Sequence, residues 1–326
     1  MWNRAVTAVL LLTIATTFCS CSSGTDTRPE LTSQLAEADE LFRNRDYAEA
    51  GTLYESVAER AEAAGDNEAY VEAAAMRART LLATGDPERG RPWLDRAAAA
   101  ATDSEPEGWS RYLSVRGRFS WKAGDLEDAT RTFEEMFLYC EDHELWERAV
   151  DAANMAAITS GTQDRFEWSR RGIETAERGG MSDWLGPLWN NLGWNYYDEE
   201  MYDEAYDALV QAREYHRAGT NELPKLIADY SVAHLLMKRG LLEKARAEMT
   251  KVLDWAAEMD EGGSQDGMEW MGFSRWDLGE IALASGERSR GLKMMETALE
   301  ELEAAGMPEW DPDQWAEKQT RLEEVR

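Results

Sequence analysis

The chain has very few cysteines. Only three of its 326 residues are cysteine, namely Cys19, Cys21 and Cys140. The first two stand at the end of an N-terminal apolar segment that has the layout of an export signal, so Cys140 has no partner left within the chain. A framework of intrachain disulfides is therefore excluded, even for an oxidising compartment. Cys140 follows Leu138 and Tyr139 and is expected to be a buried, apolar cysteine at a helix end.

Histidine is equally scarce, and this limits the kinds of catalytic site and metal site that the chain could form. His143, His216 and His234 belong to no His-Glu-x-x-His array, and no second cysteine remains to build a zinc site. The Gly-Lys-Ser/Thr phosphate loop, the Gly-x-Ser-x-Gly elbow and the Gly-x-Gly-x-x-Gly motif are also missing. Cys140 and His143 stand one helical turn apart, but two side chains do not make a site. We therefore expect no enzymatic activity, no metal and no cofactor.

Lysine is rare, and acidic residues dominate the charge. The chain carries 64 Asp and Glu against 35 Lys and Arg, seven of them Lys, for a formal net charge of -29. Such a surface repels phosphates, which argues against a nucleic-acid partner. A salty habitat or a GC-rich genome would produce the same composition, whereas a basic protein partner is the functional interpretation.

The chain has one long apolar run, which lies near the N-terminus. Arg4 supplies a positive charge, and Ala5–Phe18 is an apolar run of 14 residues. That run is too short to span a bilayer core, and the layout is that of an export signal. An ordinary secretory signal is one interpretation of it.

The residues that follow allow a second interpretation. Phe18-Cys19-Ser20-Cys21-Ser22 resembles a bacterial lipoprotein cleavage box, in which a small residue precedes the cysteine that becomes lipidated. Ser20 before Cys21 fits that pattern better than Phe18 before Cys19, and both cysteines remain candidates.

The lipoprotein resemblance has consequences for the whole N-terminal region. It implies a signal peptide over residues 1–20, then a lipidated (palmitoylated) Cys21 and a flexible tether over residues 21–30. Acyl chains anchor a protein by burying their CH₂ groups in the bilayer. Ser22 after the modified cysteine implies the periplasmic face of the outer membrane.

What the chain does contain is a pattern that returns about every 40 residues. Its clearest instance is Trp189-x-x-Leu192-Gly193-x-x-Tyr196 followed by Tyr202-x-x-Ala205-x-x-x-Leu209-x-x-Ala212. Large apolar residues recur three and four apart, which is the period of a helix face. The small residues Gly193 and Ala205 stand where two helices must approach closely. The pattern predicts stacked pairs of helices.

Five further units carry the same spacing. Their small opening residues are Ala38, Ala78, Gly117, Ala233 and Gly279. Turn signals fall at Arg45-Asp46, Gly85-Asp86, Gly124-Asp125, Gly240 and Gly286, so the turns recur at 39 to 46 residues. The stretch Trp146–Gly180 should hold another unit, whose register could be set by Trp168 or by Ile173.

This pattern resembles the tetratricopeptide repeat (TPR) family, whose usual period is about 34 residues. The resemblance covers residues 31–306 and implies an all-α fold, a right-handed α-solenoid of about seven antiparallel helix pairs. A solenoid of this kind offers a surface for binding rather than a pocket for chemistry. The charged segment 307–326 is expected to form a C-terminal capping helix.

In the TPR family the first helix of each pair lines a concave groove. The lining positions lie three before, one after and four after the small residue of each unit. Carried over to this chain, they give the protein-binding candidates Phe42, Arg79, Arg118, Trp121, Asn190, Trp194, Tyr197, Tyr230, His234 and Trp276. Aromatic and arginine side chains supply much of the energy at interfaces, and a peptide segment suits such a groove. The Lys and Asn arrangement with which some family members clamp a C-terminal carboxylate is missing, so that specificity is not expected.

Together these features predict a membrane-anchored TPR lipoprotein of the bacterial cell envelope. It would act as a scaffold or adaptor for other envelope proteins or peptides, and contact the membrane through its lipid anchor. The alternative hypothesis is a sensor of a peptide or small molecule, in which binding changes the curvature of the solenoid.

Overall fold

The computed structural model describes residues 28–261 and 265–326, and its regular structure is helical throughout those residues. The predicted signal peptide, Cys19, Cys21 and most of the expected tether lie outside the described residues. The helices are α1 (Arg28–Arg43), α2 (Tyr47–Ala64), α3 (Asn67–Ala83), α4 (Pro87–Ala100), α5 (Pro106–Lys122), α6 (Leu126–Asp142), α7 (Trp146–Thr159), α8 (Thr162–Arg178), α9 (Ser182–Asp198), α10 (Tyr202–Ala218), α11 (Glu222–Lys238), α12 (Leu242–Glu261), α13 (Gln265–Ala284), α14 (Arg288–Ala304), α15 (Met307–Trp310) and α16 (Pro312–Val325).

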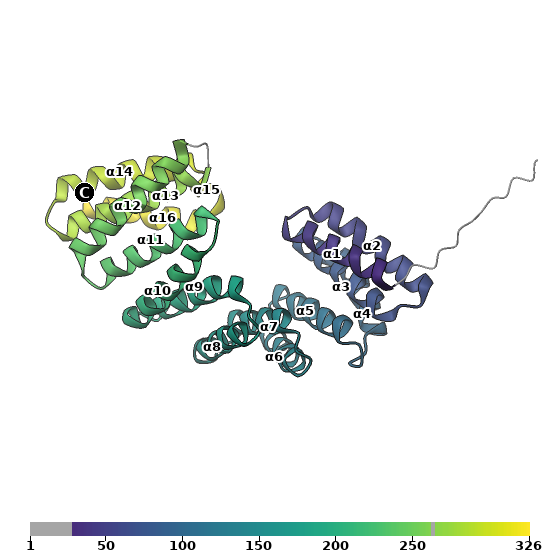
Figure 1. The fold of residues 1–326 in the computed structure, drawn as a ribbon. Helices are drawn as coiled ribbons and strands as arrows, with labels where there is room; N and C mark the ends of the chain where they lie inside the picture. The colour runs from purple at the N-terminus through teal and green to yellow at the C-terminus, as the bar shows by residue number, and fades with distance from the viewer. Residues whose placement is uncertain (1–27, 262–264) are drawn as a thin grey trace, which may run out of the picture.

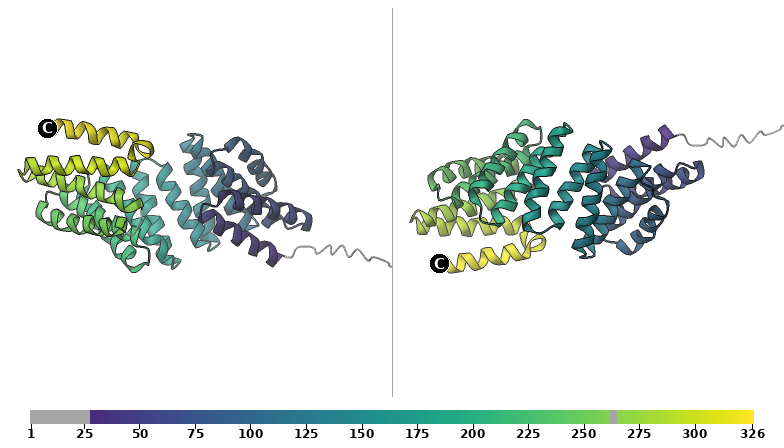
Figure 2. Two further views of the ribbon diagram at one scale, coloured as in Figure 1. Left: turned by 90° about the horizontal axis from the view of Figure 1, so that it is seen from above. Right: turned by 90° about the horizontal axis from the view of Figure 1, so that it is seen from below.

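The helices α1 to α14 form seven successive pairs, which confirms the predicted all-α solenoid. The pairs stack into an open arch, with α1–α4 in one limb and α9–α14 in the other (Figures 1 and 2). The first helices of the pairs lie toward the inside of the arch (Figure 1). Neighbouring first helices contact each other between α1 and α3, α3 and α5, and α11 and α13. Within the described residues, no helix is both long and apolar enough to cross a membrane.

Glycine and alanine make the close contacts within each pair. A Cβ atom on Gly193 of α9 would stand 2.6 Å from Cγ of Leu209 on α10. A Cβ atom on Gly117 of α5 would stand 2.7 Å from the ring of Phe133 on α6. The large side chain of the second helix therefore fills the space that the missing side chain of the first helix leaves free, as the repeat pattern predicts.

The turns within the pairs share one backbone geometry. Seven residues after the small residue of each recognised unit, the backbone has a positive φ angle, at Arg45, Gly85, Gly124, Glu200, Gly240 and Gly286. The next residue donates its N–H five residues back, as Asp86 does to Leu81 at 2.9 Å. This is the Schellman ending of a helix, which satisfies carbonyls that have no partner inside the helix.

The stretch Trp146–Gly180 forms a helix pair with a different turn. Ser160 and Gly161 between α7 and α8 are both extended, with ψ angles of 166° and 167°. Both residues that competed to set the register are buried in α8, Trp168 at 6% and Ile173 at 4% exposure. They belong to two different apolar clusters, so the helix packs toward both of its neighbours.

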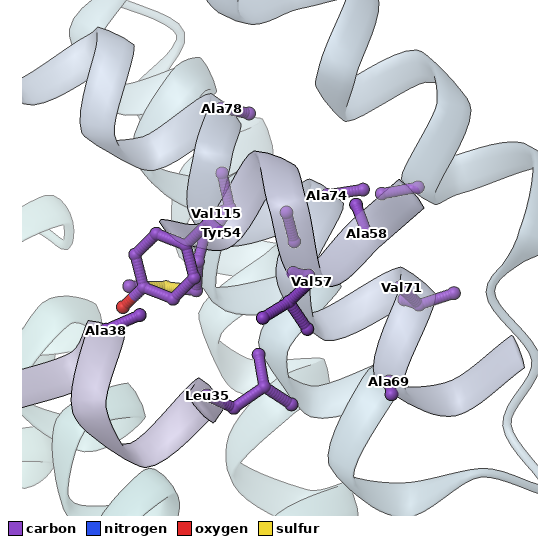
Figure 3. Close-up of a cluster of buried hydrophobic side chains, with 14 of the residues drawn as sticks. Leu35, Ala38, Tyr54, Val57, Ala58, Ala69, Val71, Ala74, Ala78 and Val115 are labelled. Carbon is purple, nitrogen blue, oxygen red and sulfur yellow. The ribbon is translucent and has the colours of Figure 1, made fainter. Parts of the chain in front are cut away.

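Buried apolar side chains form successive clusters along the solenoid. In the N-terminal limb, Tyr54 and Val57 of α2 pack among Leu35, Ala38 and Ala74 of α1 and α3 (Figure 3). Tyr54 is fully buried, and its hydroxyl donates a hydrogen bond to Asp39 at 2.5 Å. Each large apolar side chain buried in this way contributes roughly 1.5–3 kcal/mol. Stability is therefore built from contacts between neighbouring pairs.

Candidate functional site

Two cavities open on the inner wall of the arch. The C-terminal cavity has a volume of about 730 Å³ and is lined mainly by α9, α11, α13 and α16. The N-terminal cavity has a volume of about 650 Å³ and is lined by α1, α3, α5, α7 and the start of α9. Both are built mainly from first helices of pairs, which is where a TPR-like groove would lie.

The wall of the C-terminal cavity is aromatic. Each of three helices presents rings three or four residues apart, which places them on one face. They are Trp194 and Tyr197 of α9, Tyr230 and His234 of α11, and Trp270, Phe273 and Trp276 of α13. The rings also contact one another, with centroids of Tyr230 and Trp270 5.1 Å apart and those of Trp194 and Tyr197 also 5.1 Å apart. Edge-to-face contacts of this kind hold the rings in place.

A buried carboxylate organises the polar side of this cavity. Asp277 is 3% exposed and accepts a hydrogen bond from Nδ1 of His234 at 2.7 Å. The other ring nitrogen, Nε2, lies 3.1 Å from the Tyr197 hydroxyl. Burial opposes ionisation of Asp277, but His234 and Lys318 lower its pKa below the ordinary value. Burial and this carboxylate raise the pKa of Tyr230 well above its ordinary value, which keeps the phenol a neutral donor.

The C-terminal helix α16 forms the remaining wall of the C-terminal cavity. The Lys318 ammonium lies 4.5 Å from the ring centroid of Trp276 and 5.4 Å from that of Phe273. Arg321 makes two hydrogen bonds to Glu280 of α13, at 2.9 and 3.1 Å. Leu322 is buried against Trp276. Burial lowers the pKa of Lys318, although Asp277 nearby favours the charged form. The helix closes one end of the inner wall and leaves the cavity open.

The N-terminal cavity is polar and rich in arginine. Its lining includes Arg43, Arg45, Arg79, Arg111 and Arg148. Most of the carboxylates beside them are engaged in ion pairs. Asp39 pairs with Arg111 at 2.6 Å, and Arg148 pairs with Glu107 at 2.7 Å. This part of the wall gathers cations in a strongly acidic protein.

The structure distributes the predicted groove residues over different environments. Seven of them line a cavity: Phe42 and Arg79 the N-terminal one, and Trp194, Tyr197, Tyr230, His234 and Trp276 the C-terminal one. Arg118 is buried and donates to Asp151 at 2.7 Å and to the hydroxyl of Ser114 at 2.6 Å. Trp121 is 43% exposed, and neither it nor Asn190 lines either cavity.

Two cavity residues lie at a position that the sequence interpretation did not use. Arg111 and Phe273 each stand six residues before the small residue of their unit. That position is one further turn along the same helix face, so the repeat spacing could have indicated it. No comparable signal marks Lys318 and Arg321, because α16 lies outside the repeat.

The one thiol and imidazole that stand close in sequence do not form a pair. Cys140 is fully buried, and burial raises its pKa to about 12. His143 is exposed and stacks on Tyr139, with ring centroids 4.1 Å apart. A thiol with such a pKa is a poor nucleophile. Within residues 28–261 and 265–326, His, Cys, Asp and Glu side chains form no group of three that could hold a metal ion.

Comparisons with known proteins support the fold. No protein-family model matches the sequence, and no curated protein matches it. A signal-transduction ATPase with a tetratricopeptide repeat sensor from Pyrococcus horikoshii is similar over 91% of this chain and 46% of its own, with a TM-score of 0.59 and 13% identity. A Rap protein complexed with Competence and Sporulation Factor is similar over 88% of this chain and 79% of its own, with a TM-score of 0.53 and 14% identity. The C-terminal part of a TPR repeat-containing protein from Cytophaga hutchinsonii is similar over 87% of this chain and 98% of its own, with a TM-score of 0.53 and 14% identity. At these identities the likeness shows a TPR-like fold and nothing more.

Proposed function

We propose that this protein is a non-enzymatic scaffold or adaptor that binds polypeptides along the inner wall of its arch. We also propose that it is anchored to the bacterial cell envelope through a lipid on Cys21. In this proposal its partners are other envelope proteins or peptides, and the tether holds the arch at the periplasmic face of the outer membrane. Tethering would raise the effective concentration of the arch for partners held at the same membrane.

The C-terminal cavity is the observation that supports polypeptide binding most directly. Seven aromatic or imidazole rings face a space of about 730 Å³, next to a buried carboxylate and two cations of α16. Interface energy concentrates in aromatic and arginine side chains that are held in pockets. The rings are held by one another and by the network around Asp277, so little conformational entropy is lost when a ligand contacts them. A peptide side chain fits a space of this size.

The aromatic wall can be tested by removing two of its rings. Trp194→Ala combined with Tyr197→Ala should weaken partner capture at least tenfold, because truncating a central aromatic residue commonly costs about 2 kcal/mol or more. The measurement is crosslinking and quantitative pull-down from membranes, with helicity followed by circular dichroism. Trp121→Ala is the matched control, since Trp121 is exposed and lies outside both cavities. Equal capture by the double variant and the control would count against this wall as the binding surface.

The lipid anchor can be tested independently of the groove. Cys21→Ala should move the protein from the membrane fraction to the soluble fraction and abolish palmitate labelling, because each buried CH₂ group contributes roughly 0.8 kcal/mol to anchoring. Cys19→Ala is the control and should remain membrane-bound. Membrane association that survives Cys21→Ala would rule out this anchor, and release by Cys19→Ala instead would move the modification to that residue.

A further inference from the structure

Arg79 differs from Arg111 and Arg148, the other partly buried arginines of the N-terminal cavity, because it makes no direct ion pair with a carboxylate of the described residues. It lies on α3 and lines the cavity, with its guanidinium carbon 5.1 Å from the ring centroid of Phe42. Within residues 28–261 and 265–326, its side chain makes neither a hydrogen bond nor an ion pair. Its N–H groups therefore face the cavity without a protein acceptor.

The carboxylates near Arg79 form ion pairs with other arginines. Asp39 is held by Arg111 at 2.6 Å, and Asp151 is held by Arg118 at 2.7 Å. Glu72, which is buried, lies 3.0 Å from Arg148. Arg79 is thus left without a direct ion pair, whereas Arg111 and Arg148 each make at least one. Burial and the nearby Arg118 charge lower the pKa of Arg79, although Asp151 acts in the opposite direction, as expected of a cation whose charge is only partly compensated.

Arginine without a partner is costly to keep in a partly desolvated wall. A guanidinium recognises a carboxylate through two parallel N–H···O bonds, and this recognition depends on its planar shape. The cavity of about 650 Å³ has room for an acidic side chain beside Phe42. The net charge of -29 does not forbid such a ligand, because charges beyond about 8 Å are largely screened at physiological ionic strength.

We propose that Arg79 is a carboxylate-binding subsite for an aspartate or glutamate side chain of the polypeptide ligand. This proposal rests on the proposed polypeptide-binding function. The ligand would carry an acidic residue at the N-terminal cavity, while other side chains contact the aromatic wall of the C-terminal cavity. Since no carboxylate of the described residues forms a direct ion pair with Arg79, an acidic ligand residue placed there fixes the position of the ligand along the arch.

The test uses defined peptides and the full chain. Isothermal titration calorimetry would compare an N-acetylated, C-amidated tetraglutamate with its tetraglutamine counterpart. A third peptide, acetyl-Gly-Gly-Leu with a free C-terminus, distinguishes an acidic side chain from a terminal carboxylate. Tetraglutamate should bind at least tenfold more tightly than either of the others. Arg79→Gln should weaken tetraglutamate binding at least tenfold. The affinity of Arg79→Lys should lie between those of the wild type and Arg79→Gln, because lysine keeps the charge and loses the planar fork.

Arg290→Gln is the matched control. Arg290 is exposed on α14, where it pairs with Glu287 at 2.8 Å, so its loss changes the net charge equally and should leave binding unchanged. Circular dichroism should show that Arg79→Gln is about as stable as the wild type, since no direct ion pair is lost and Asp151 keeps its pair with Arg118. Equal binding of the three peptides, absence of binding, or equal loss in the two Gln variants would overturn the proposal. Tighter binding of the peptide with the free C-terminus would overturn the side-chain assignment. The experiment with Trp194→Ala and Tyr197→Ala tests the proposed function separately. Failure of the polypeptide-binding function can therefore be distinguished from failure of the Arg79 subsite.

Discussion

Replacement of Asp277 by alanine is expected to lower the free energy of unfolding by about 3 kcal/mol. The carboxylate is 3% exposed and accepts the proton of His234 Nδ1 at 2.7 Å. It also lies near the partly buried ammonium of Lys318. Without Asp277, the imidazole loses its acceptor, and the ammonium loses the carboxylate that most favours its charged form. Chemical denaturation followed by circular dichroism measures the difference.

The pKa of the Asp277 carboxylate predicts how the stability difference between wild type and Asp277→Ala depends on pH. The pKa of Asp277 is lower in the folded state than its ordinary value, so the ionised form stabilises the fold above the unfolded-state pKa, which is about 3.9. That contribution is lost as the pH falls through the lowered, folded-state pKa. The stability gap between wild type and Asp277→Ala should be complete at neutral pH and narrow only below about pH 4.

The control for Asp277 is a carboxylate without these partners. Asp254 is exposed on α12, so Asp254→Ala should change the stability by less than about 0.5 kcal/mol. If Asp277→Ala behaved like Asp254→Ala at neutral pH, the network of Asp277 and His234 would not stabilise the C-terminal limb.

A second large effect is expected at Gly193, one of the closest contacts within a helix pair. Gly193→Ala should lower the free energy of unfolding by about 2 kcal/mol, because the added methyl group overpacks the contact between α9 and α10. The new Cβ atom would stand 2.6 Å from Cγ of Leu209 and 3.3 Å from its backbone nitrogen. The side chain can change rotamer, whereas the backbone must move. Thermal and chemical unfolding measure this loss.

Gly161→Ala is the matched control for this substitution. No heavy atom lies within 4 Å of a Cβ atom built there, and the φ angle of -68° suits any residue. Its stability should stay within about 0.5 kcal/mol of the wild type. The double variant Gly193→Ala with Leu209→Ala should lose less free energy of unfolding than the sum of the two single losses, because the smaller side chain makes room for the methyl group. Strict additivity would mean that the two residues do not oppose each other as described.

The helix pairs could be predicted from the sequence wherever two local signals agree. A small residue marks the contact, and seven residues later the chain turns through a left-handed residue, as from Gly117 to Gly124. The spacing is constant in these units because their first helices end in the same Schellman geometry. The pair α7 and α8 lacks the second signal, since Ser160 and Gly161 are extended. Its register was therefore open in the sequence.

The candidate site was less predictable than the pairs. Trp194, Tyr197, Tyr230 and His234 could be found because they follow the spacing of the repeat, and they line one cavity. Arg148 and Asp151 could not be placed, because they lie on α7, whose register the sequence leaves open. Lys318 comes from a helix outside the repeat, and local periodicity carries no information about which distant helix it meets.

The helix α9 has a consequence for how the two cavities behave together. Its start contributes Trp184 to the N-terminal cavity, and its end contributes Trp194 and Tyr197 to the C-terminal cavity. Seventeen residues make a helix about 25 Å long, with Pro187 in its second turn between Trp184 and the two rings. A ligand that moves the helix as a unit at one end displaces the rings at the other, and the resulting change of affinity would act equally in both directions.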